Sequence, residues 1–298
     1  MKQPVKDYDR SRRYPETWLA MEQLVGTGKA RSIARKNATP LFIVASTICL
    51  FVVDEDFDEV KRMKIILQDQ QHDDTLAEMC QKVLEQLIIN KRVEERDEIL
   101  RDFHRIVGSI VLFYDPLSVS LASLLDVEAG LIERRLKLLR SVLVIPDKKD
   151  VDGTIKPLHL SFRDFLTSQS KTDANSFKID TTETNHSLTA GCLRVMSDQT
   201  SGLRKNICKL ENDGILQSEI RDTHSYIKPE LKYAFRFWVR HLENGKPLVD
   251  DDGIYTFFEK HFLHWLEVMS ILGLIDEALA HLASLQELLS VSNLLYAD

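Results

Sequence analysis

The sequence lacks closely spaced cysteines, and this absence excludes one class of site. Cysteine occurs four times in 298 residues, at Cys49, Cys80, Cys192 and Cys208. No CxxC pair is therefore available for zinc binding or for redox chemistry. Because most of these cysteines fall inside apolar helical patterns, we expect buried free thiols in a reducing compartment.

A long hydrophobic run is also missing. The longest apolar stretch covers residues 40–53, whereas a membrane-spanning helix needs about 20 apolar residues. The first forty residues are polar and basic, and a secretory signal peptide has an apolar centre instead. These observations predict a cytoplasmic protein without membrane contacts, in which residues 40–53 form a buried helix.

The chain has no excess of positive charge. Its formal net charge of −7 argues against a dedicated nucleic-acid-binding protein. The helix expected at 127–140 carries cationic side chains, but Asp126, Glu128 and Glu133 lie among them and reduce their field. Since phosphate contacts need a net basic face, a winged-helix nucleic-acid-binding adaptor is the alternative rather than the main hypothesis. The cationic residues of this helix are Arg134, Arg135, Lys137 and Arg140.

A phosphate-binding loop is absent as well. Residues 26–29 read Gly-Thr-Gly-Lys, but the GxxxxGK[ST] pattern needs a glycine at the position of Gln23 and a serine or threonine at that of Ala30. We interpret this stretch as a flexible linker. No serine or cysteine stands in a nucleophile-elbow context either. The sequence therefore predicts a protein that is not an enzyme.

One helix carries residues at metal-ligand spacing. His261 and His264 lie three residues apart, with Glu259 and Glu267 nearby. The H-E-x-x-H order of zinc proteases is missing, and aromatic and leucine side chains surround the histidines. We interpret this segment as an amphipathic packing helix and predict no metal site.

What the sequence does contain is an ample supply of core residues in helical patterns. Apolar residues make up 44% of the chain, enough for two or three modest domains. Between residues 76 and 87, for example, apolar side chains follow the i, i+3, i+4, i+7 spacing of a helix. Helices are expected at 58–67, 74–89, 94–114, 186–197, 231–242, 251–272 and 275–289.

The stretch from 138 to 166 departs from this helical pattern. It ends one helix, continues as the β-branched run Val142–Ile145, and reaches a charged turn closed by Asp152 and Gly153, which is a hairpin signal. A returning strand is expected at 155–160. Ser161 then has the position of an N-cap for a short helix. This order of helix, strand, turn, strand and helix predicts a winged-helix domain.

The same region resembles fungal NACHT proteins, which belong to the STAND class of signalling P-loop NTPases. The matching runs are PLSVSLASLLDVEAGLIERRLKLLRSVLVIPD (116–147) and LHLSFRDFL (158–166). The resemblance covers roughly residues 38–290. Further matching segments are ATPLFIVASTICLFV (38–52), LRKNICKL (203–210), YAFRFWVRHL (233–242) and HFLHWLEVMSILG (261–273).

The resemblance implies the part of such a protein that follows the nucleotide-binding core. The expected fold class is mainly α, with a helical domain, a winged-helix domain that has a small β-hairpin wing, and a second helical domain. The predicted boundaries are 1–37 for a basic flexible segment with a short helix, 38–96 for the helical domain, 97–170 for the winged helix, 171–185 for a linker, and 186–298 for the second helical domain.

Two residues are nucleotide-binding candidates by this resemblance. His159 stands in the motif His-Leu-Ser-Phe-Arg-Asp-Phe (159–165), whose histidine in related immune receptors contacts the β-phosphate of ADP and holds the protein closed. Its alternative is a strand-end histidine bonded to the backbone. Pro40 matches a proline at the edge of the adenine pocket, and it also suits the first position of a helix. ADP or ATP is expected only if the chain pairs with a nucleotide-binding domain.

The predicted function is that of a non-catalytic regulatory module. It would control a nucleotide-dependent closed–open switch through domain contacts, in self/non-self recognition or programmed-cell-death signalling. The expected partner is another protein or a nucleotide-binding domain of the same family. The missing phosphate loop and propeller repeats leave two explanations open, a truncated coding region or a degenerate paralogue that kept only the regulatory half.

Overall fold

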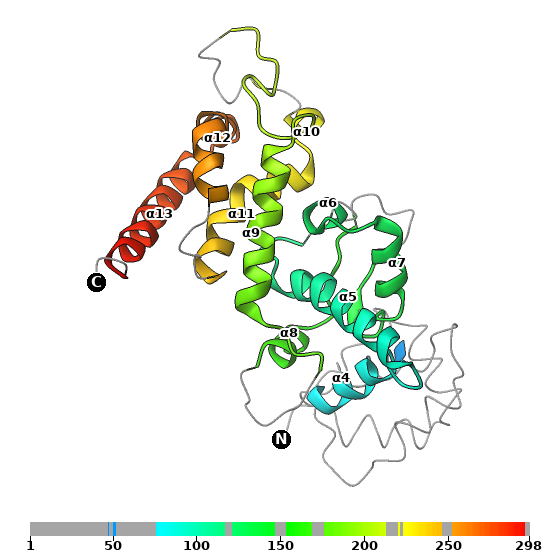
Figure 1. The fold of residues 1–298 in the computed structure, drawn as a ribbon. Coiled ribbons are helices and arrows are strands. Elements are labelled where there is room, and N and C mark those ends of the chain that lie inside the picture. The colour runs from blue at the N-terminus through cyan, green and yellow to red at the C-terminus, as the bar shows by residue number, and fades with distance from the viewer. Residues whose placement is uncertain are drawn as a thin grey trace, which may run out of the picture. The chain divides into compact units, whose positions relative to one another are not determined.

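The structure of the protein is a computed structural model, and it confirms the mainly α fold class. Helices are joined by irregular segments, and the sheet within the described residues is a small two-stranded one (Figure 1). Pro40, Cys49 and most of the expected buried helix at 40–53 lie outside the described residues, which are 47, 50–51, 76–116, 121–146, 153–168, 176–212, 220, 223–245 and 252–295.

The secondary-structure elements follow the expected order along the chain. In sequence they are α4 (Leu76–Glu85), α5 (Val93–Leu112), α6 (Leu121–Leu125), α7 (Ala129–Lys137), β1 (Leu143–Val144), β2 (Lys156–Pro157), α8 (Leu160–Thr167), α9 (Thr181–Ser197), α10 (Thr223–Tyr226), α11 (Pro229–Gly245), α12 (Asp252–Ile271) and α13 (Ile275–Leu295).

Internal contacts divide the chain into two units, each built from several segments. The first unit contains residues 1–96, 136–144 and 157–165, and the second contains 97–135, 145–156 and 166–298. The segment 97–170 contributes to both units, so this division differs from the domain boundaries expected from the sequence. Those boundaries stay a prediction.

In the first unit, α4 buries the apolar stripe that the sequence indicates. Its members recur at helical spacing, so they lie on one face of the helix, and removing that face from water is what stabilises α4. The expected burial is confirmed for Met79, Cys80, Val83 and Leu84 of α4 and for Leu87 in the turn that follows it, each at most 8% exposed.

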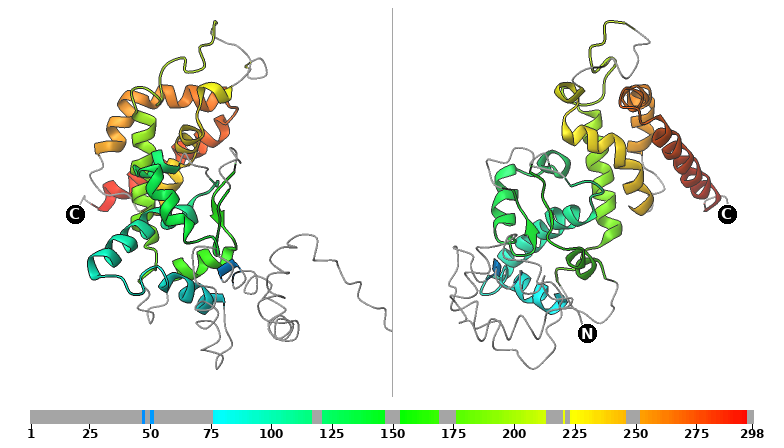
Figure 2. Two further views of the ribbon diagram at one scale, coloured as in Figure 1. Left: turned by 90° about the vertical axis from the view of Figure 1, so that its right-hand side faces the viewer. Right: turned by 180° about the vertical axis from the view of Figure 1, so that it is seen from behind.

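Aromatic side chains fill the core of the second unit. Trp238 of α11 and Trp265 of α12 are both fully buried, and their rings meet edge to face with centroids 6.3 Å apart. The indole nitrogen of Trp265 donates a hydrogen bond to the Phe235 carbonyl at 2.8 Å. These contacts hold α12 against α11, while α11 packs most extensively against α9. Figure 2 shows these helices side by side in two further views.

Helix α9 begins earlier than the sequence analysis expects. Asp180 is its N-cap, and its Oδ1 accepts the backbone N–H groups of Thr182 at 2.9 Å and Glu183 at 3.0 Å. A carboxylate here satisfies helix donors that otherwise lack partners. The helix therefore begins at Thr181 and not at the expected residue 186, so the expected start of this helix is wrong.

The turn between α12 and α13 is set by a glycine. Gly273 has a φ of 70°, which side chains disfavour. Its N–H bonds to the Ser270 carbonyl at 3.0 Å, and the Leu274 N–H bonds to the Met269 carbonyl at 2.8 Å. This pair of bonds is the Schellman motif, which ends α12 and lets α13 start two residues later.

The cysteines agree with the sequence analysis where the structure describes them. Cys80, Cys192 and Cys208 are buried free thiols, and burial raises the pKa of Cys80 to about 12. Among the described residues, no helix combines the length and the apolar character needed to cross a membrane.

Candidate functional site

The predicted phosphate-sensing histidine lies at a junction between strand and helix. His159 follows β2 by two residues and directly precedes α8. Its side chain is exposed, and the N–H of Phe162 bonds to its carbonyl at 3.1 Å, which closes the first turn of the helix. A hydrogen bond from the Leu158 N–H to the Val142 carbonyl, 2.9 Å long, fixes the strand that leads to it.

One ring nitrogen of His159 is occupied locally. The backbone N–H of Ser161 donates to Nδ1 at 3.1 Å. Because Nδ1 accepts this bond, the neutral ring carries its proton on Nε2. His159 therefore caps α8 with one nitrogen and has an N–H donor on the other. A donor of this kind, on an exposed ring, can bond to a phosphate oxygen.

The second nucleotide-binding candidate, Pro40, lies outside the described residues. The order of elements from α6 through α7, β1 and β2 to α8 is the order expected for a winged helix. The strands are short, two residues each, and they form one two-stranded sheet. The assignment to the winged-helix class stays a prediction.

One of the cationic side chains of helix α7 is already paired with carboxylates of the same protein. Arg135 binds two carboxylates of α5, Asp102 at 2.7 Å and Glu98 at 3.0 Å. An arginine paired in this way offers less positive potential to a nucleic-acid phosphate. The geometry therefore gives no specific support to the nucleic-acid alternative.

The two histidines of α12 contact each other and aromatic rings. His261 and His264 have ring centroids 5.9 Å apart, and His261 also stacks on Phe257 at 5.8 Å. Their Nδ1 atoms are buried without a hydrogen-bond partner among the described residues. No group of three or more metal-binding side chains occurs within that part of the chain.

A buried polar network in the second unit was missed by the sequence analysis. Asn185 of α9, His241 and Tyr233 of α11 form a continuous chain of hydrogen bonds. His241 Nδ1 lies 2.8 Å from Asn185 Oδ1, and its Nε2 lies 2.8 Å from the Tyr233 hydroxyl. The Asn185 amide donates to the Thr181 carbonyl at 2.7 Å, so Oδ1 must accept and His241 Nδ1 must donate.

The network keeps its ionisable members neutral. His241 is fully buried, and burial lowers its pKa to about 3. Burial, followed by the nearby Cys192, raises the pKa of Tyr233 well above its ordinary range. The network thus joins α9 to α11 by satisfied neutral hydrogen bonds rather than by a charge pair.

The rim of this network reaches solvent through Tyr114, which follows α5. Its hydroxyl accepts a bond from the Asn244 amide at 2.9 Å, and its ring stacks on Phe237 with centroids 5.6 Å apart. The Arg240 guanidinium lies over the Tyr114 ring at 5.5 Å. These contacts fix the segment after α5 against α11 through aromatic packing, a cation–π contact and hydrogen bonds.

A bidentate ion pair joins α11 to α13. Arg236 donates to both carboxylate oxygens of Glu277, each at 2.8 Å. The hydrogen bonds from Arg236 lower the pKa of Glu277, and the partly exposed pair also lies near Asp115, 3.7 Å from Arg236. This pairing positions α13, and it leaves the guanidinium occupied.

Sequence signals for the buried network were present but weak. His241 and Tyr233 fall in the apolar stripe of the 231–242 segment, where a histidine interrupts an otherwise hydrophobic pattern. Their partner Asn185 is 56 residues away from His241. Periodicity reports only local spacing, so the partner could not be identified without the fold.

Comparisons with known proteins give one relationship that covers most of the chain. No protein-family model matches the sequence, and no solved structure matches it. The chain is similar to the vegetative incompatibility protein HET-E-1 of Podospora anserina, with 25% identity over 288 residues and coverage of 88% of this chain. The match covers 20% of HET-E-1, so the chain spans about a fifth of the length of this relative.

Proposed function

We propose that the chain is a regulatory module of a fungal NACHT-type STAND signalling protein, acting in incompatibility or cell-death signalling. In this role it contacts a nucleotide-binding domain and favours the closed, ADP-bound state. A complete switch of this kind needs two states with different contacts to the nucleotide. The module supplies contacts that exist only in the closed state.

The observation that carries this proposal is the exposed Nε2–H of His159 within a chain that is similar to an incompatibility protein over 88% of its length. The bond from Ser161 to Nδ1 orients the ring and defines its tautomer. The donor is therefore in place before any partner binds. A fixed donor loses little conformational freedom on binding, which favours affinity.

The module acts without catalysing a reaction of its own. The sequence supports this view because it lacks a phosphate-binding loop, the element that would hold the phosphates and the lysine next to them. The nucleotide chemistry then belongs to the partner domain. The buried thiols Cys80, Cys192 and Cys208 support a cytoplasmic, reducing environment.

The proposal is tested by binding in trans. The chain is titrated against a separately expressed nucleotide-binding domain of a fungal NACHT protein, loaded with ADP or with a non-hydrolysable ATP analogue. We expect binding to the ADP form to be stronger by roughly fivefold or more, the range of a typical coupling free energy. Equal affinity for both forms, or no binding to either, contradicts the proposal.

The same preparation tests the nucleic-acid alternative. Duplex DNA is added at low and at high salt, because a protein that neutralises several phosphates loses affinity steeply as salt rises. Under our proposal the chain shows no salt-dependent DNA binding. A steep salt slope, together with loss of that binding when the exposed Arg134 and Lys137 are replaced by glutamine, would favour the winged-helix adaptor instead.

A further inference from the structure

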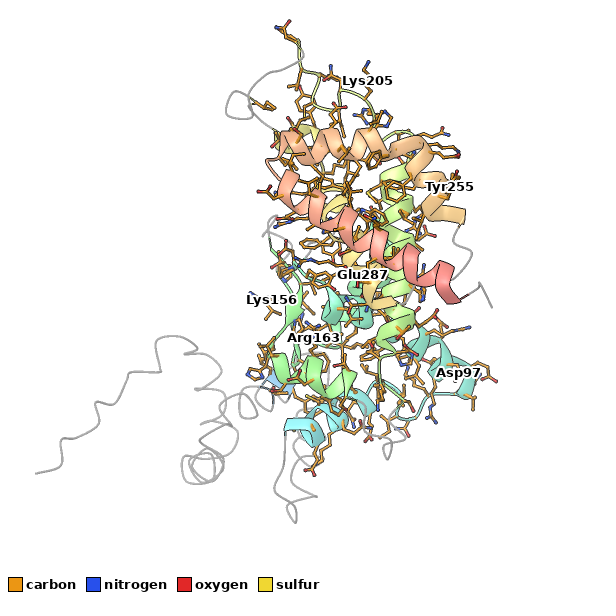
Figure 3. The ribbon with its side chains drawn as sticks, turned by 90° about the vertical axis from the view of Figure 1, so that its left-hand side faces the viewer. Asp97, Lys156, Arg163, Lys205, Tyr255 and Glu287 are labelled. Atoms are coloured by element: carbon orange, nitrogen blue, oxygen red, sulfur yellow. The ribbon has the colours of Figure 1, made fainter. Side chains whose placement is uncertain are left out.

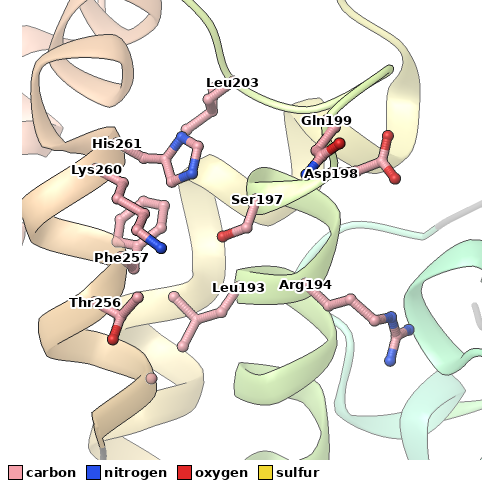
Figure 4. A pocket seen from close by; sticks show the side chains of 11 residues that line it. Leu193, Arg194, Ser197, Asp198, Gln199, Leu203, Thr256, Phe257, Lys260 and His261 are labelled. Carbon is pink, nitrogen blue, oxygen red and sulfur yellow. The ribbon is translucent and has the colours of Figure 1, made fainter.

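A cleft in the second unit takes no part in the proposed function. Its volume is about 660 Å³, and it lies between the last turn of α9, the turn that follows it, and the first half of α12. Figure 4 shows Leu193 and Ser197 of α9 and Lys260 of α12 directed into the space between the two helices. The cleft is thus formed within one unit and needs no other domain to complete it.

The turn that closes one end of the cleft is rigidly built. Asp198 Oδ1 accepts from the backbone N–H of Thr200 at 3.0 Å and of Ser201 at 2.7 Å, and from both of their hydroxyls at 2.8 Å. A side chain at Gly202 would place its Cβ 2.4 Å from the Asp198 carbonyl oxygen, so only glycine fits there. This wall of the cleft is therefore formed before any ligand arrives.

Lys260 is the cation available inside the cleft. Its ammonium group and the Ser197 hydroxyl point into the same space from opposite walls (Figure 4). Thr256 lies one helical turn before Lys260 on the same face of α12 and also lines the cleft. Together these three side chains contribute an ammonium and two hydroxyl groups to the lining of the cleft.

The other charged side chains of the lining are held elsewhere. Arg194 donates to the carbonyls of Ser123 at 2.9 Å and Leu124 at 3.1 Å, and in Figure 4 its guanidinium points away from Lys260. The Asp198 carboxylate also points away and is engaged by its own turn. Burial, with smaller effects from His264 and Lys260, lowers the pKa of His261, which keeps that ring neutral. Lys260 is therefore the charged side chain that points into the cleft.

The floor of the cleft is apolar. Leu193, Leu203 and Phe257 line it beside the polar groups. A ligand that matches both the polar groups and the apolar floor of the cleft carries an anionic group that binds Lys260 and a planar or aliphatic group that packs on the floor. An apolar floor with a few convergent polar groups is the usual composition of a small-molecule site.

We propose that this cleft binds a small organic phosphate monoester, with its phosphate on Lys260, Ser197 and Thr256 and its apolar part against Leu193 and Phe257. A phosphate dianion offers three acceptor oxygens, which matches the three donors. The apolar part distinguishes the ligand from a free phosphate ion. The site belongs to a helical region distant in sequence from His159, and it does not depend on the proposed function.

The test uses the full chain and phenyl phosphate as the probe. Binding is followed by calorimetry and by tryptophan fluorescence, since Trp238 lies 5.4 Å from the ring of Phe257. We expect saturable binding of phenyl phosphate that is stronger than binding of inorganic phosphate, with phenol weaker still. This order requires both the charge and the apolar surface.

Substitutions at exposed positions identify the site without endangering the fold. Lys260→Gln should weaken phenyl phosphate binding by about tenfold or more, the loss expected for a charge-assisted hydrogen bond. Thr256→Val should weaken it by roughly two- to tenfold. Lys205→Gln is the matched control, because Lys205 is an exposed lysine on the loop after α9 and does not line the cleft (Figure 3).

The results for the two lysine variants distinguish a specific binding site from nonspecific attraction of an anion to surface lysines. Lys205→Gln should leave the affinity within about twofold of the unaltered chain. Three results overturn the proposal: no saturable binding of phenyl phosphate, equal losses in the two lysine variants, or equal affinities for phenyl phosphate and inorganic phosphate.

Discussion

Asn185, His241 and Tyr233 show how single polar residues specify the packing of two helices. Each donor and acceptor in this chain has a partner, from the Asn185 amide to the Tyr233 hydroxyl, which also accepts the Tyr114 N–H at 3.4 Å. A buried polar group costs free energy unless it is paired. Any other alignment of α9 and α11 would leave at least one of these groups unpaired, so the network favours this one.

Removing one member of the network should lower the free energy of unfolding by more than the loss of its own hydrogen bonds, because a buried partner is left unpaired. Asn185→Ala leaves the buried His241 Nδ1–H without an acceptor, and we expect the free energy of unfolding to fall by about 1–3 kcal/mol. Urea denaturation measures this change. The control is Asn244→Ala, which removes an exposed amide that bonds to the Tyr114 hydroxyl, and it should cost at most about 1 kcal/mol. Equal losses in the two variants would contradict the role given to the buried network.

His241 should make stability depend on pH in a defined window. Its pKa is about 3 in the folded state, against 6.5 for an unperturbed histidine. Between these values the unfolded chain binds a proton that the folded chain does not, so stability decreases as pH falls from about 6.5 toward 3. The contribution of His241 is about 1.4 kcal/mol per pH unit in this window.

Urea midpoints for the unaltered chain and for His241→Gln at several pH values measure this contribution. The variant is less stable at neutral pH, but its stability should vary less between pH 6.5 and 4. The partly buried His104 and His261 and the buried His281 also have lowered pKa values and remain in both proteins. Identical slopes for the two proteins would show that His241 is not neutral and buried as described.

Among the elements, close approach between α6 and α9 depends on one glycine. A Cβ at Gly191 would lie 2.3 Å from the Leu124 carbonyl oxygen. Because that atom belongs to the backbone of α6, it can move only if the helix moves. The absence of a side chain at Gly191 therefore lets α6 and α9 pack directly together.

Two alanine substitutions separate this packing effect from general glycine effects. Gly191→Ala should destabilise the chain by about 1–3 kcal/mol through overpacking. In Gly130→Ala the new Cβ would meet only the Glu128 side chain, at 3.4 Å, so this helical substitution should be neutral or stabilising by up to about 1 kcal/mol. Thermal unfolding of both variants compares them. A Gly191→Ala protein as stable as the unaltered chain would mean that the two helices are not held this close.

Most helices could be predicted because their apolar stripes are local signals. The segments expected at 231–242, 251–272 and 275–289 correspond to α11, α12 and α13, which begin within two residues of the expected positions. The start of α9 was missed because its first turn is polar, and only the Asp180–Glu183 pair marks it. The pairing of Asn185 with His241 joins residues far apart in the sequence, and the cleft at Lys260 is formed by two helices that are also far apart. Sequence periodicity describes only local spacing, so it predicts neither feature.

At the level of the whole molecule, the proposed function places nucleotide chemistry in a partner domain. The chain alone should therefore hydrolyse neither ATP nor GTP, since it has no phosphate loop to position the γ-phosphate and Mg²⁺. Phosphate release is measured on protein purified over two columns, with a mock purification alongside. Turnover that exceeds the mock and follows the protein through the second column would contradict this expectation.

The most direct test of the proposed function is the effect of His159 on ADP affinity. The measurement uses a complete fungal NACHT protein in which residues 38–290 of this chain replace the matching region, with His159 intact or changed to alanine. Lys156→Ala is the control, because Lys156 is also exposed and lies three residues before His159 in β2. In the isolated chain, His159→Ala should change the free energy of unfolding by no more than about 0.5 kcal/mol, as for a surface site.

In the complete protein, calorimetry should show that His159→Ala weakens ADP binding by about ten- to hundredfold, equivalent to roughly 1.5–3 kcal/mol for a charge-assisted hydrogen bond. Lys156→Ala should leave ADP affinity unchanged. Unchanged ADP affinity in the His159→Ala protein, or an equal loss in the Lys156→Ala protein, would contradict the claim that His159 holds the closed state through the nucleotide.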